Sequence, residues 1–297
     1  MTWMLAIRAW ANLVLAGRGL VGSVLAMTHI FDPGPVSEPF LSLVEDYPGA
    51  DVYPPAAFRV EWGPIFHRGR LDGSARLLVI GQDPAQSETV VRRILVGEAG
   101  HRAQGLMAKL GFDHSYLLVN TFLYSVYGQA GGEQHKKDAA IVAYRNRWLD
   151  AIFASNQIEA VLALGSLADD AWQKWKATPA GQAHSPGYEH VTHPTQPESS
   201  SGGDPAKLKA AIVAMLENWN QALTQLHPLI THPDVAGPLV PYGTAFAPNE
   251  RVEIPQFDVP AGTPDWMRSP AAWAQRQGAT AADKRRNITI TIPDGVI

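Results

Sequence analysis

Residues 77–84 read LLVIGQDP, an apolar run that stops at a glycine, an amide, a carboxylate and a proline. A short apolar run bounded by turn residues is typical of a strand buried on both faces. In open α/β sheets, ligands bind beyond the carboxyl ends of the strands. Asp83 is therefore a candidate for chemistry, although an Asp before a Pro is also a common turn residue.

The same strand pattern recurs through the middle of the chain. Short buried strands are predicted at residues 76–80, 116–120, 159–164 and 189–192. Helices are predicted at residues 99–110 before Gly111, at 138–155, from a Ser166 cap to Trp175, and from Asp204-Pro205 onward. Because strands and helices alternate, we predict an α/β fold, a three-layer αβα sandwich around a central four-stranded parallel sheet.

The two flanks of this region differ in composition from it. Residues 1–38 contain an apolar stretch from Met4 to Met27, but Arg8 and Arg18 leave uncharged pieces shorter than the roughly 20 residues of a membrane helix. We interpret it as an N-terminal helical extension or a misplaced start, and expect no membrane partner. Residues 39–226 form the predicted α/β domain. Residues 227–297, rich in Pro and Gly, predict a C-terminal extension that wraps the core or is partly disordered.

Composition excludes several kinds of site. The 297 residues contain no cysteine, which rules out disulfides, a cysteine nucleophile and thiolate-bound zinc or iron–sulfur clusters. A chain without disulfides fits a reducing cytosol, so we expect a cytoplasmic protein. The formal net charge of −4 gives no global positive field for nucleic acid, although a local basic face would be enough.

Polar side chains follow three of the predicted strands. These are Asp83, Asn120 and His193. Each has an ordinary structural explanation, as a turn cap, a strand terminator bonded to backbone and a satisfied loop histidine. Together, a carboxylate, an amide and an imidazole at one sheet edge are what a pocket for a planar polar ring needs.

Three short motifs resemble those of a known family. GQDP at 81–84, LVN at 118–120 and HPT at 193–195 are similar to motif A, the central Asn and motif B of the uracil-DNA glycosylase superfamily. LVGEAG at 95–100, a helix ending at 110–112, and ALGSLA at 163–168 resemble its iron–sulfur branch. The resemblance covers roughly residues 48–226. Without cysteine, the chain would be a cluster-free relative of that branch.

The resemblance implies roles for the three strand ends. Asp83 would stabilise the sugar cation and position water, and a neutral His193 would donate to uracil O2 as the base leaves. Asn120 would read uracil N3–H and O4, which cytosine presents in the opposite sense. Gln82 would contribute to the pocket wall. No cofactor or metal is implied, and the base would be flipped out of a duplex or taken from a single strand.

The chain departs from the family pattern around the base. Ala85 replaces the Tyr that excludes the thymine methyl, so exclusion would depend on Gln86 or Glu88. Leu95 stands where the iron–sulfur branch stacks a Phe on uracil. Either Leu95 is enough to pack on the uracil ring, or an aromatic residue such as Phe122 or Tyr124 stacks on it instead. After motif B the loop reads TQPESS, in which Thr195, Ser199 and Ser200 would contact phosphate rather than wedge apart the bases.

The segment GGEQHKK at 131–137 resembles, through its last three residues, an insertion of a superfamily branch that cross-links itself to abasic DNA. The functional interpretation is that Lys136 and Lys137 contact phosphate, with His135 near the sugar. The structural alternative is a solvated loop that leads into the helix at Asp138.

Two functions follow from these patterns. The first is a monofunctional uracil-DNA glycosylase of base excision repair, which acts on single- or double-stranded uracil-containing DNA and leaves an abasic site. The second is a binder of uracil or abasic DNA that retains or cross-links its product, with poor turnover. A nucleotide-binding α/β protein is disfavoured because no Walker-type loop or G-x-G-x-x-G follows a strand.

Overall fold

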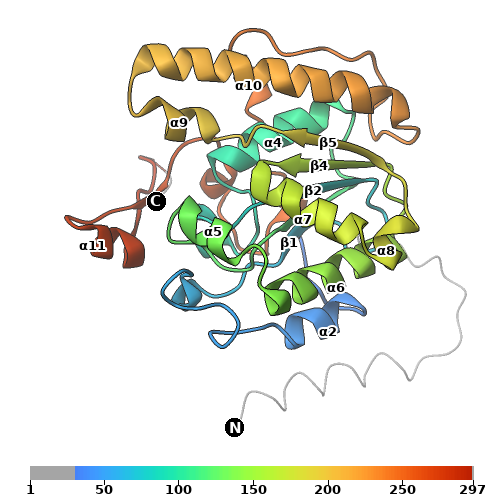
Figure 1. The fold of residues 1–297 in the computed structure, drawn as a ribbon. Helices are drawn as coiled ribbons and strands as arrows, with labels where there is room; N and C mark the ends of the chain where they lie inside the picture. The colour runs from blue at the N-terminus through green and yellow to red at the C-terminus, as the bar shows by residue number, and fades with distance from the viewer. Residues whose placement is uncertain (1–30, 296–297) are drawn as a thin grey trace, which may run out of the picture.

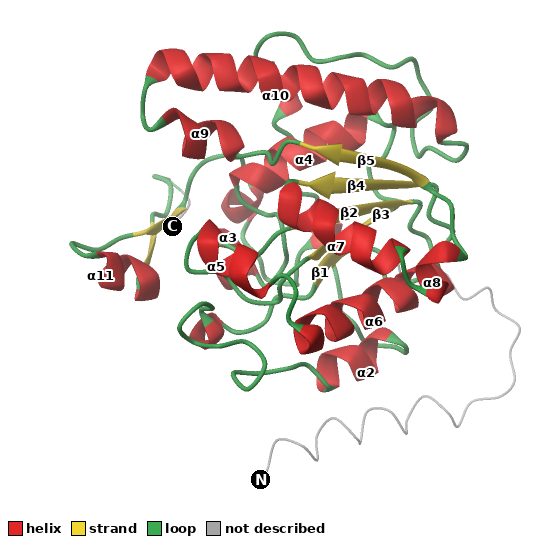
Figure 2. Cartoon of the chain, in the orientation of Figure 1, coloured by secondary structure: helices red, strands yellow, loops and turns green. Residues whose placement is uncertain are grey.

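The computed structural model describes residues 31–295, and the predicted helical extension between Met4 and Met27 lies outside them (Figure 1). The described chain is an α/β protein with one central mixed sheet and helices around it (Figure 2). None of the helices in residues 31–295 combines the length and apolarity needed to cross a bilayer.

The central sheet has five strands in the order β1-β3-β2-β4-β5. Their bounds are His67–Gly69, Leu77–Gly81, Tyr116–Asn120, Ala160–Leu164 and Gly187–Val191, for β1 to β5. The last four are parallel and correspond to the predicted strands, whereas β1 pairs antiparallel with β3. The prediction of a four-stranded parallel sheet is therefore wrong, because β1 adds a fifth, antiparallel strand next to β3. The sequence of β1, His-Arg-Gly, has no apolar run to reveal it.

Helices fill the connections between strands and continue beyond the sheet. They are α2 Phe40–Glu45, α3 Gln86–Val91, α4 Glu98–Lys109, α5 Gln129–His135, α6 Ala139–Ser155, α7 Ser166–Lys176, α8 Pro179–Gln182, α9 Gln196–Ser201, α10 Pro205–Leu226 and α11 Ala281–Arg286. Short 3₁₀ helices cover Val60–Trp62, His227–Leu229, Pro248–Glu250, Gln256–Asp258 and Asp265–Arg268. A second sheet pairs β6 Ala274–Arg276 with β7 Ile288–Ile290.

Local signals set several helix ends. The Asp204 side chain accepts from the backbone N–H groups of Ala206 and Lys207, which satisfies two free donors at the start of α10. Gly111, with a φ of +87°, ends α4 in the conformation that glycine adopts most easily. The predicted Ser166 cap is wrong, because Gly165 is the capping residue of α7 and Ser166 already lies inside it.

Each central strand is buried on both faces. In β2, Leu78 and Ile80 pack with residues of α2, α6 and α7, whereas Leu77 and Val79 pack with residues of α4 and α10. This alternation follows from the two-residue period of a strand. Figure 1 shows α4 and α10 on one side of the sheet and α2 and α6 on the other.

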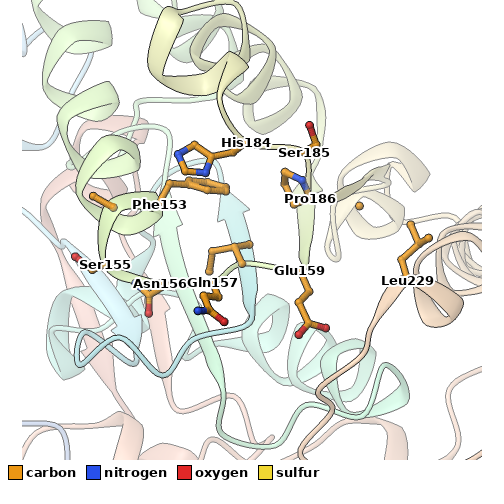
Figure 3. A pocket seen from close by; sticks show the side chains of 12 residues that line it. Phe153, Ser155, Asn156, Gln157, Glu159, His184, Ser185, Pro186 and Leu229 are labelled. Carbon is orange, nitrogen blue, oxygen red and sulfur yellow. The ribbon is translucent and has the colours of Figure 1, made fainter.

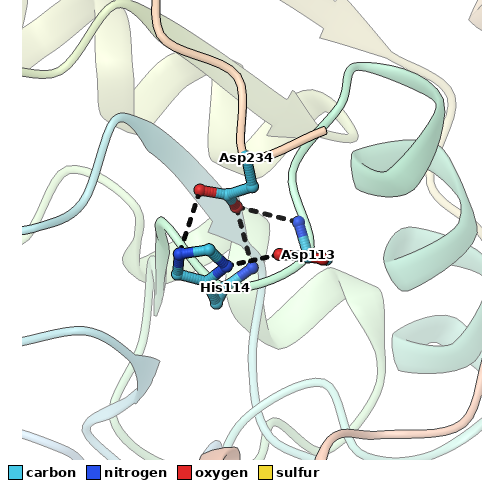
Figure 4. A group of neighbouring side chains, drawn as sticks. All are labelled: Asp113, His114 and Asp234. Atoms are coloured by element: carbon cyan, nitrogen blue, oxygen red, sulfur yellow. Dashed lines mark hydrogen bonds and ion pairs between the residues drawn. The ribbon is translucent and has the colours of Figure 1, made fainter. Parts of the chain in front are cut away.

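Buried polar contacts attach the C-terminal extension to the sheet domain. Asp258, with no exposed surface, lies 2.8 Å from Arg70 and 3.5 Å from the equally buried Arg68, and accepts a 2.8 Å hydrogen bond from Tyr116 Oη. Asp234 accepts the backbone N–H groups of residues 113–115 (Figure 4). The described part of the extension therefore wraps the core, one of the two predicted alternatives.

An apolar cluster fixes the extension against the segment that follows motif A. Ile254, Val259 and Trp273 are buried together with Val91 and Val96. Fully burying a side chain of this size contributes about 1.5–3 kcal/mol. The extension is thus packed beside α3, next to the end of β2.

Candidate active site

A cleft of about 930 Å³ lies at the carboxyl ends of the parallel strands. In Figure 2 the arrowheads of β4 and β5 point to the side that carries α5, α9 and the C-terminal strands. Seven predicted site residues line it, namely Gln82, Asp83, Ala85, Leu95, His193, Thr195 and Ser199. Both the position and the size are those of a ligand site.

A second hollow, of about 760 Å³, lies at the opposite edge, where β4 and β5 begin (Figure 3). Its polar wall includes Asn156, Glu159 and His184. Glu159 is already engaged, because it accepts from the backbone of Thr231 and His232. The predicted constellation lies at the carboxyl edge, so we take the first cleft as the candidate site.

Asp83 sits in the cleft with one oxygen held by the protein. The backbone N–H of Val126 donates to Asp83 Oδ2 at 3.0 Å, and Arg59 fixes this loop through Ser125 Oγ at 2.9 Å. Desolvation by the surrounding protein raises the pKa of Asp83 to about 6, with a contribution from the Glu88 charge, against the Val126 hydrogen bond and the nearby Arg59 and Arg276. Such a carboxyl changes charge near neutral pH, as a catalytic base must.

The imidazole of His193 is held neutral and in one tautomer. Its Nδ1 accepts from the Thr195 backbone N–H at 3.3 Å and lies 3.2 Å from Thr195 Oγ1. Since Nδ1 accepts, the proton of the neutral ring is on Nε2. Burial lowers the pKa of His193 to about 4, although Glu198 opposes the shift. His193 is therefore a neutral Nε2–H donor at physiological pH.

Gly165 lets the ends of β2 and β5 approach. It has a φ of +90°, and a Cβ there would lie 2.6 Å from Gln82 Nε2 and 3.2 Å from His193 Cβ. Any larger residue would push Gln82 away from His193. The glycine after β4 thus brings two predicted pocket residues together.

Asn120 lies beside the cleft rather than in its lining. It pairs in register with Gly81, and a Cβ on Gly81 would lie 2.3 Å from Asn120 Oδ1 and 3.6 Å from Leu95 Cδ1. Among the described residues, Asn120 Oδ1 is buried with no hydrogen-bond partner. An unpaired buried acceptor costs about 1–3 kcal/mol, so it calls for an explanation such as a ligand.

Leu95 covers this region in a strained conformation. It has a φ of +52°, which is uncommon for a residue other than glycine, and it is 6% exposed at the cleft wall. Glu88 braces the turn, because its carboxylate accepts from the backbone N–H groups of Ala85 and Val96. Glu88 therefore joins the motif A turn to the Leu95 turn, a role that the sequence did not suggest.

The structure excludes two of the residues that were candidates for stacking on the base. Phe122 and Tyr124 are buried in the aromatic core with Phe58 and Tyr53, away from the cleft lining, so neither stacks there. Gln86 lines the cleft, but its Nε2 is 3.4 Å from the Ala274 carbonyl of the extension.

The predicted DNA-binding residues divide into two groups. Thr195 and Ser199 line the cleft, and the polar loop after motif B forms the short helix α9. Ser200 is outside the lining and bonds to Pro197 O.

The GGEQHKK segment does not bring its basic residues to the cleft. His135 Nδ1 lies 2.6 Å from Asp138 Oδ2, and its ring packs 5.4 Å from that of Phe58. Lys136 pairs with Glu133 at 2.6 Å, and neither Lys136 nor Lys137 lines the cleft. These contacts are structural, but the predicted solvated loop is wrong, because residues Gln129–His135 form α5 and the His135 side chain is only 13% exposed.

Arginines that could have formed a basic patch beside the cleft are structural. Arg93 pairs with Asp32, and Arg102 bridges Glu98 and Glu198 while donating to the Pro194 carbonyl. These charges are neutralised within the fold, so they add little net attraction for DNA.

Two features of the structure were not found from the sequence, one in the cleft and one away from it. Arg276, from β6, lines the cleft although it lies far from the motifs along the chain. Within residues 31–295, the one cluster with metal-ligand geometry is Asp113, His114 and Asp234 (Figure 4). Asp234 there is committed to backbone N–H groups, and the cluster is separate from the cleft lining.

The sequence was compared with protein-family models and with curated proteins, and neither comparison found a match.

Proposed function

We propose that this chain is a monofunctional uracil-DNA glycosylase with the three-layer αβα fold of that superfamily, acting without a cofactor. The observation that carries the proposal is the pairing in one cleft of Asp83, whose pKa is raised, with a neutral His193 whose Nε2 carries the proton. The Asp83 carboxylate can stabilise positive charge that develops on the sugar, and the His193 Nε2–H can stabilise negative charge that develops on the leaving base.

The proposed chemistry is hydrolysis of the N1–C1′ bond of deoxyuridine. The bonding electrons leave with uracil N1, the negative charge spreads to O2, and the His193 Nε2–H donates a hydrogen bond to that oxygen. Asp83 stabilises the cationic sugar, and accepts a proton from the water whose oxygen bonds to C1′. The Val126 N–H holds the other side of the carboxylate. The uracil anion then takes up a proton from solvent and Asp83 releases its proton to solvent, which gives free uracil, an abasic site and the original carboxylate.

Asn120 supports selection of the base. Its unpaired Oδ1 suits the N3–H of uracil, and its Nδ2 suits O4. Cytosine would place an acceptor against Oδ1 and a donor against Nδ2, leaving buried groups unpaired. Leu95 would have to yield or pack on the ring as the base enters, since it lies beside both Gly81 and the cleft.

The assay uses a labelled oligonucleotide with a single uracil, single- and double-stranded. Strand cleavage after alkali, over many turnovers, supports the glycosylase. Cleavage that stalls at one product per protein, with or without an adduct on a denaturing gel, supports the lesion-binding alternative. No cleavage of either substrate would refute the proposal.

We predict an acid limb near pH 6 in the rate of excision. The active form of Asp83 is the carboxylate, and its pKa is about 6, so single-turnover rates should fall about tenfold per pH unit below 6 and level off above it. His193, with a pKa of about 4, is already neutral across this window. A limb near pH 4 instead would contradict the role of Asp83.

We predict that His193→Ala lowers the single-turnover rate by about 10²–10³-fold, the usual cost of removing one donor to a developing anion. The matched control is His190→Ala, because His190 also lines the cleft but lies on the exposed surface of β5. Its rate should change by less than about threefold. Equal losses in the two variants would indicate that neither imidazole acts on the leaving base.

A further inference from the structure

We propose that Arg276, supplied by the C-terminal extension, binds the DNA phosphodiester beside the extruded nucleotide. The extension is then part of the substrate-binding surface. This inference rests on the proposed function, and adds to it a phosphate-binding residue outside the family motifs.

The backbone around Arg276 is firmly placed. Arg276 ends β6 and pairs with Ile288 of β7. Two residues earlier, Ala274 is 5% exposed within the apolar cluster that contains Val91 and Val96. Its carbonyl also accepts from Gln86, the first residue of α3. The strand therefore brings the guanidinium to the cleft from a packed support beside the motif A turn.

Arg276 differs from three other arginines of this region in forming no ion pair with any residue that the structure describes. Arg251 and Arg102 share Glu98, and Arg268 pairs with Glu253 and Asp265. Within residues 31–295, Arg276 forms no ion pair, and it is exposed at the cleft wall. A free guanidinium in a cleft is a strong, planar ligand for a phosphate group.

The charges around Arg276 favour an anion. The positive charges of Arg276 and Arg59 act on each other unfavourably: burial lowers the pKa of Arg59, and the charge of Arg276 lowers it further. A phosphodiester near Arg276 would offset this repulsion. Since the whole chain has a net charge of −4, attraction for DNA must come from such local cations.

The competing explanation is that Arg276 only tunes Asp83, because its charge also acts on that carboxyl. The two roles predict different measurements. A phosphate ligand sets affinity and its salt dependence, whereas a tuning charge sets the pH at which excision is lost.

The test measures dissociation constants for a uracil-containing oligonucleotide between about 50 and 200 mM salt. Asp83→Asn serves as the background so that substrate is not consumed. We expect Arg276→Ala to weaken binding about tenfold at the lower salt, and to reduce the slope of log K against log salt by about 0.9, the value for one phosphate contact. Arg276→Lys should keep most of the slope.

The matched control is Arg147→Ala. Arg147 is about half exposed on α6 and pairs with Asp46, outside the cleft lining. Arg147→Ala changes the net charge by the same amount as Arg276→Ala, but it should leave the slope of log K against log salt unchanged. With Asp83 restored, the Arg147→Ala control should excise uracil at saturation within about threefold of the unmodified rate.

Three results would overturn the inference. The first is that Arg276→Ala has the same slope of log K against log salt as the Arg147→Ala control. The second is that Arg276→Ala binds with unchanged affinity but loses excision at a different pH, which would mean that Arg276 tunes the pKa of Asp83. The third is loss of binding to dUMP but not to the oligonucleotide, which would indicate a site for free nucleotides. If the unmodified chain excises uracil, these results overturn the Arg276 inference alone, whereas absence of excision refutes the proposed function.

Discussion

Replacing Asp83 by Asn is expected to lower the rate of uracil excision by about 10³-fold, within the usual range for loss of a positioned base. The amide keeps the shape of the carboxyl and its acceptor for the Val126 N–H, but it carries no negative charge and accepts no proton from water. Single-turnover excision is the measurement. A rate within tenfold of the unmodified chain would mean that the reaction does not depend on Asp83.

The same substitution should stabilise the fold above pH 6. The pKa of Asp83 is raised from its ordinary value of 3.8 to about 6, so between these values the folded chain holds a proton that the unfolded chain has released. Stability therefore falls as pH rises through this window, and the full cost is present above pH 6. Asp83 is partly exposed to the cleft, so we discount the shift and expect a gain of about 1–2 kcal/mol.

Urea unfolding at pH 8 and at pH 4 measures this effect. The gain should be present in full at pH 8 and mostly lost at pH 4, where the carboxyl is protonated in the folded chain and about two-fifths protonated in the unfolded one. Asp46→Asn, at an exposed carboxylate, is the control and should show little change at either pH. Equal gains at both pH values would attribute the effect to something other than the ionisation of Asp83.

Replacing Asp258 by Ala is expected to lower the free energy of unfolding by about 3–5 kcal/mol, the usual cost of leaving a buried charge without its partner. Arg68 has no exposed surface, and its nearest carboxylate is that of Asp258. Tyr116 would lose its acceptor at the same time. Urea unfolding at neutral pH measures the change.

The control for Asp258→Ala is Asp265→Ala. Both carboxylates belong to short 3₁₀ helices of the extension, but Asp265 is 82% exposed in its pair with Arg268, and exposed pairs contribute about 0–1 kcal/mol. A loss at Asp258 no larger than that at Asp265 would show that the extension is not held by its buried charge. It would also weaken the structural support assigned to Arg276.

The fold could be predicted where the signal is local. Three of the four parallel strands, β2, β3 and β4, were found because each contains an apolar run, whereas β5, with the sequence GYEHV, carries no such run. Gly111 marked the end of α4, and Asp204-Pro205 marked the start of α10. The strand β1 was missed because its three residues are stabilised by pairing with β3 rather than by their own pattern. The order of the extension depends on distant partners such as Arg68, which no local pattern reveals.

The candidate site could be predicted from the sequence only in part. Asp83 and His193 were identified because the ends of parallel strands meet at one edge, whereas Leu95 was identified through the motif resemblance. Arg276 reaches that edge from outside the sheet domain, so strand-end reasoning could not find it. The position of His135 depends on a contact with Asp138 and on packing against Phe58. Neither contact can be read from the sequence, so the sequence could not show that His135 is structural rather than a DNA ligand.

The late position of β6 along the chain has a consequence for biosynthesis. Chains emerge from the ribosome amino terminus first, and domains fold in that order. The sheet and its motif residues are complete by Leu226, whereas the strand that carries Arg276 follows nearly fifty residues later. A growing chain therefore forms the sheet edge that carries the motif residues before it acquires the extension, so the cleft is complete only after residues 274–276 have been synthesised.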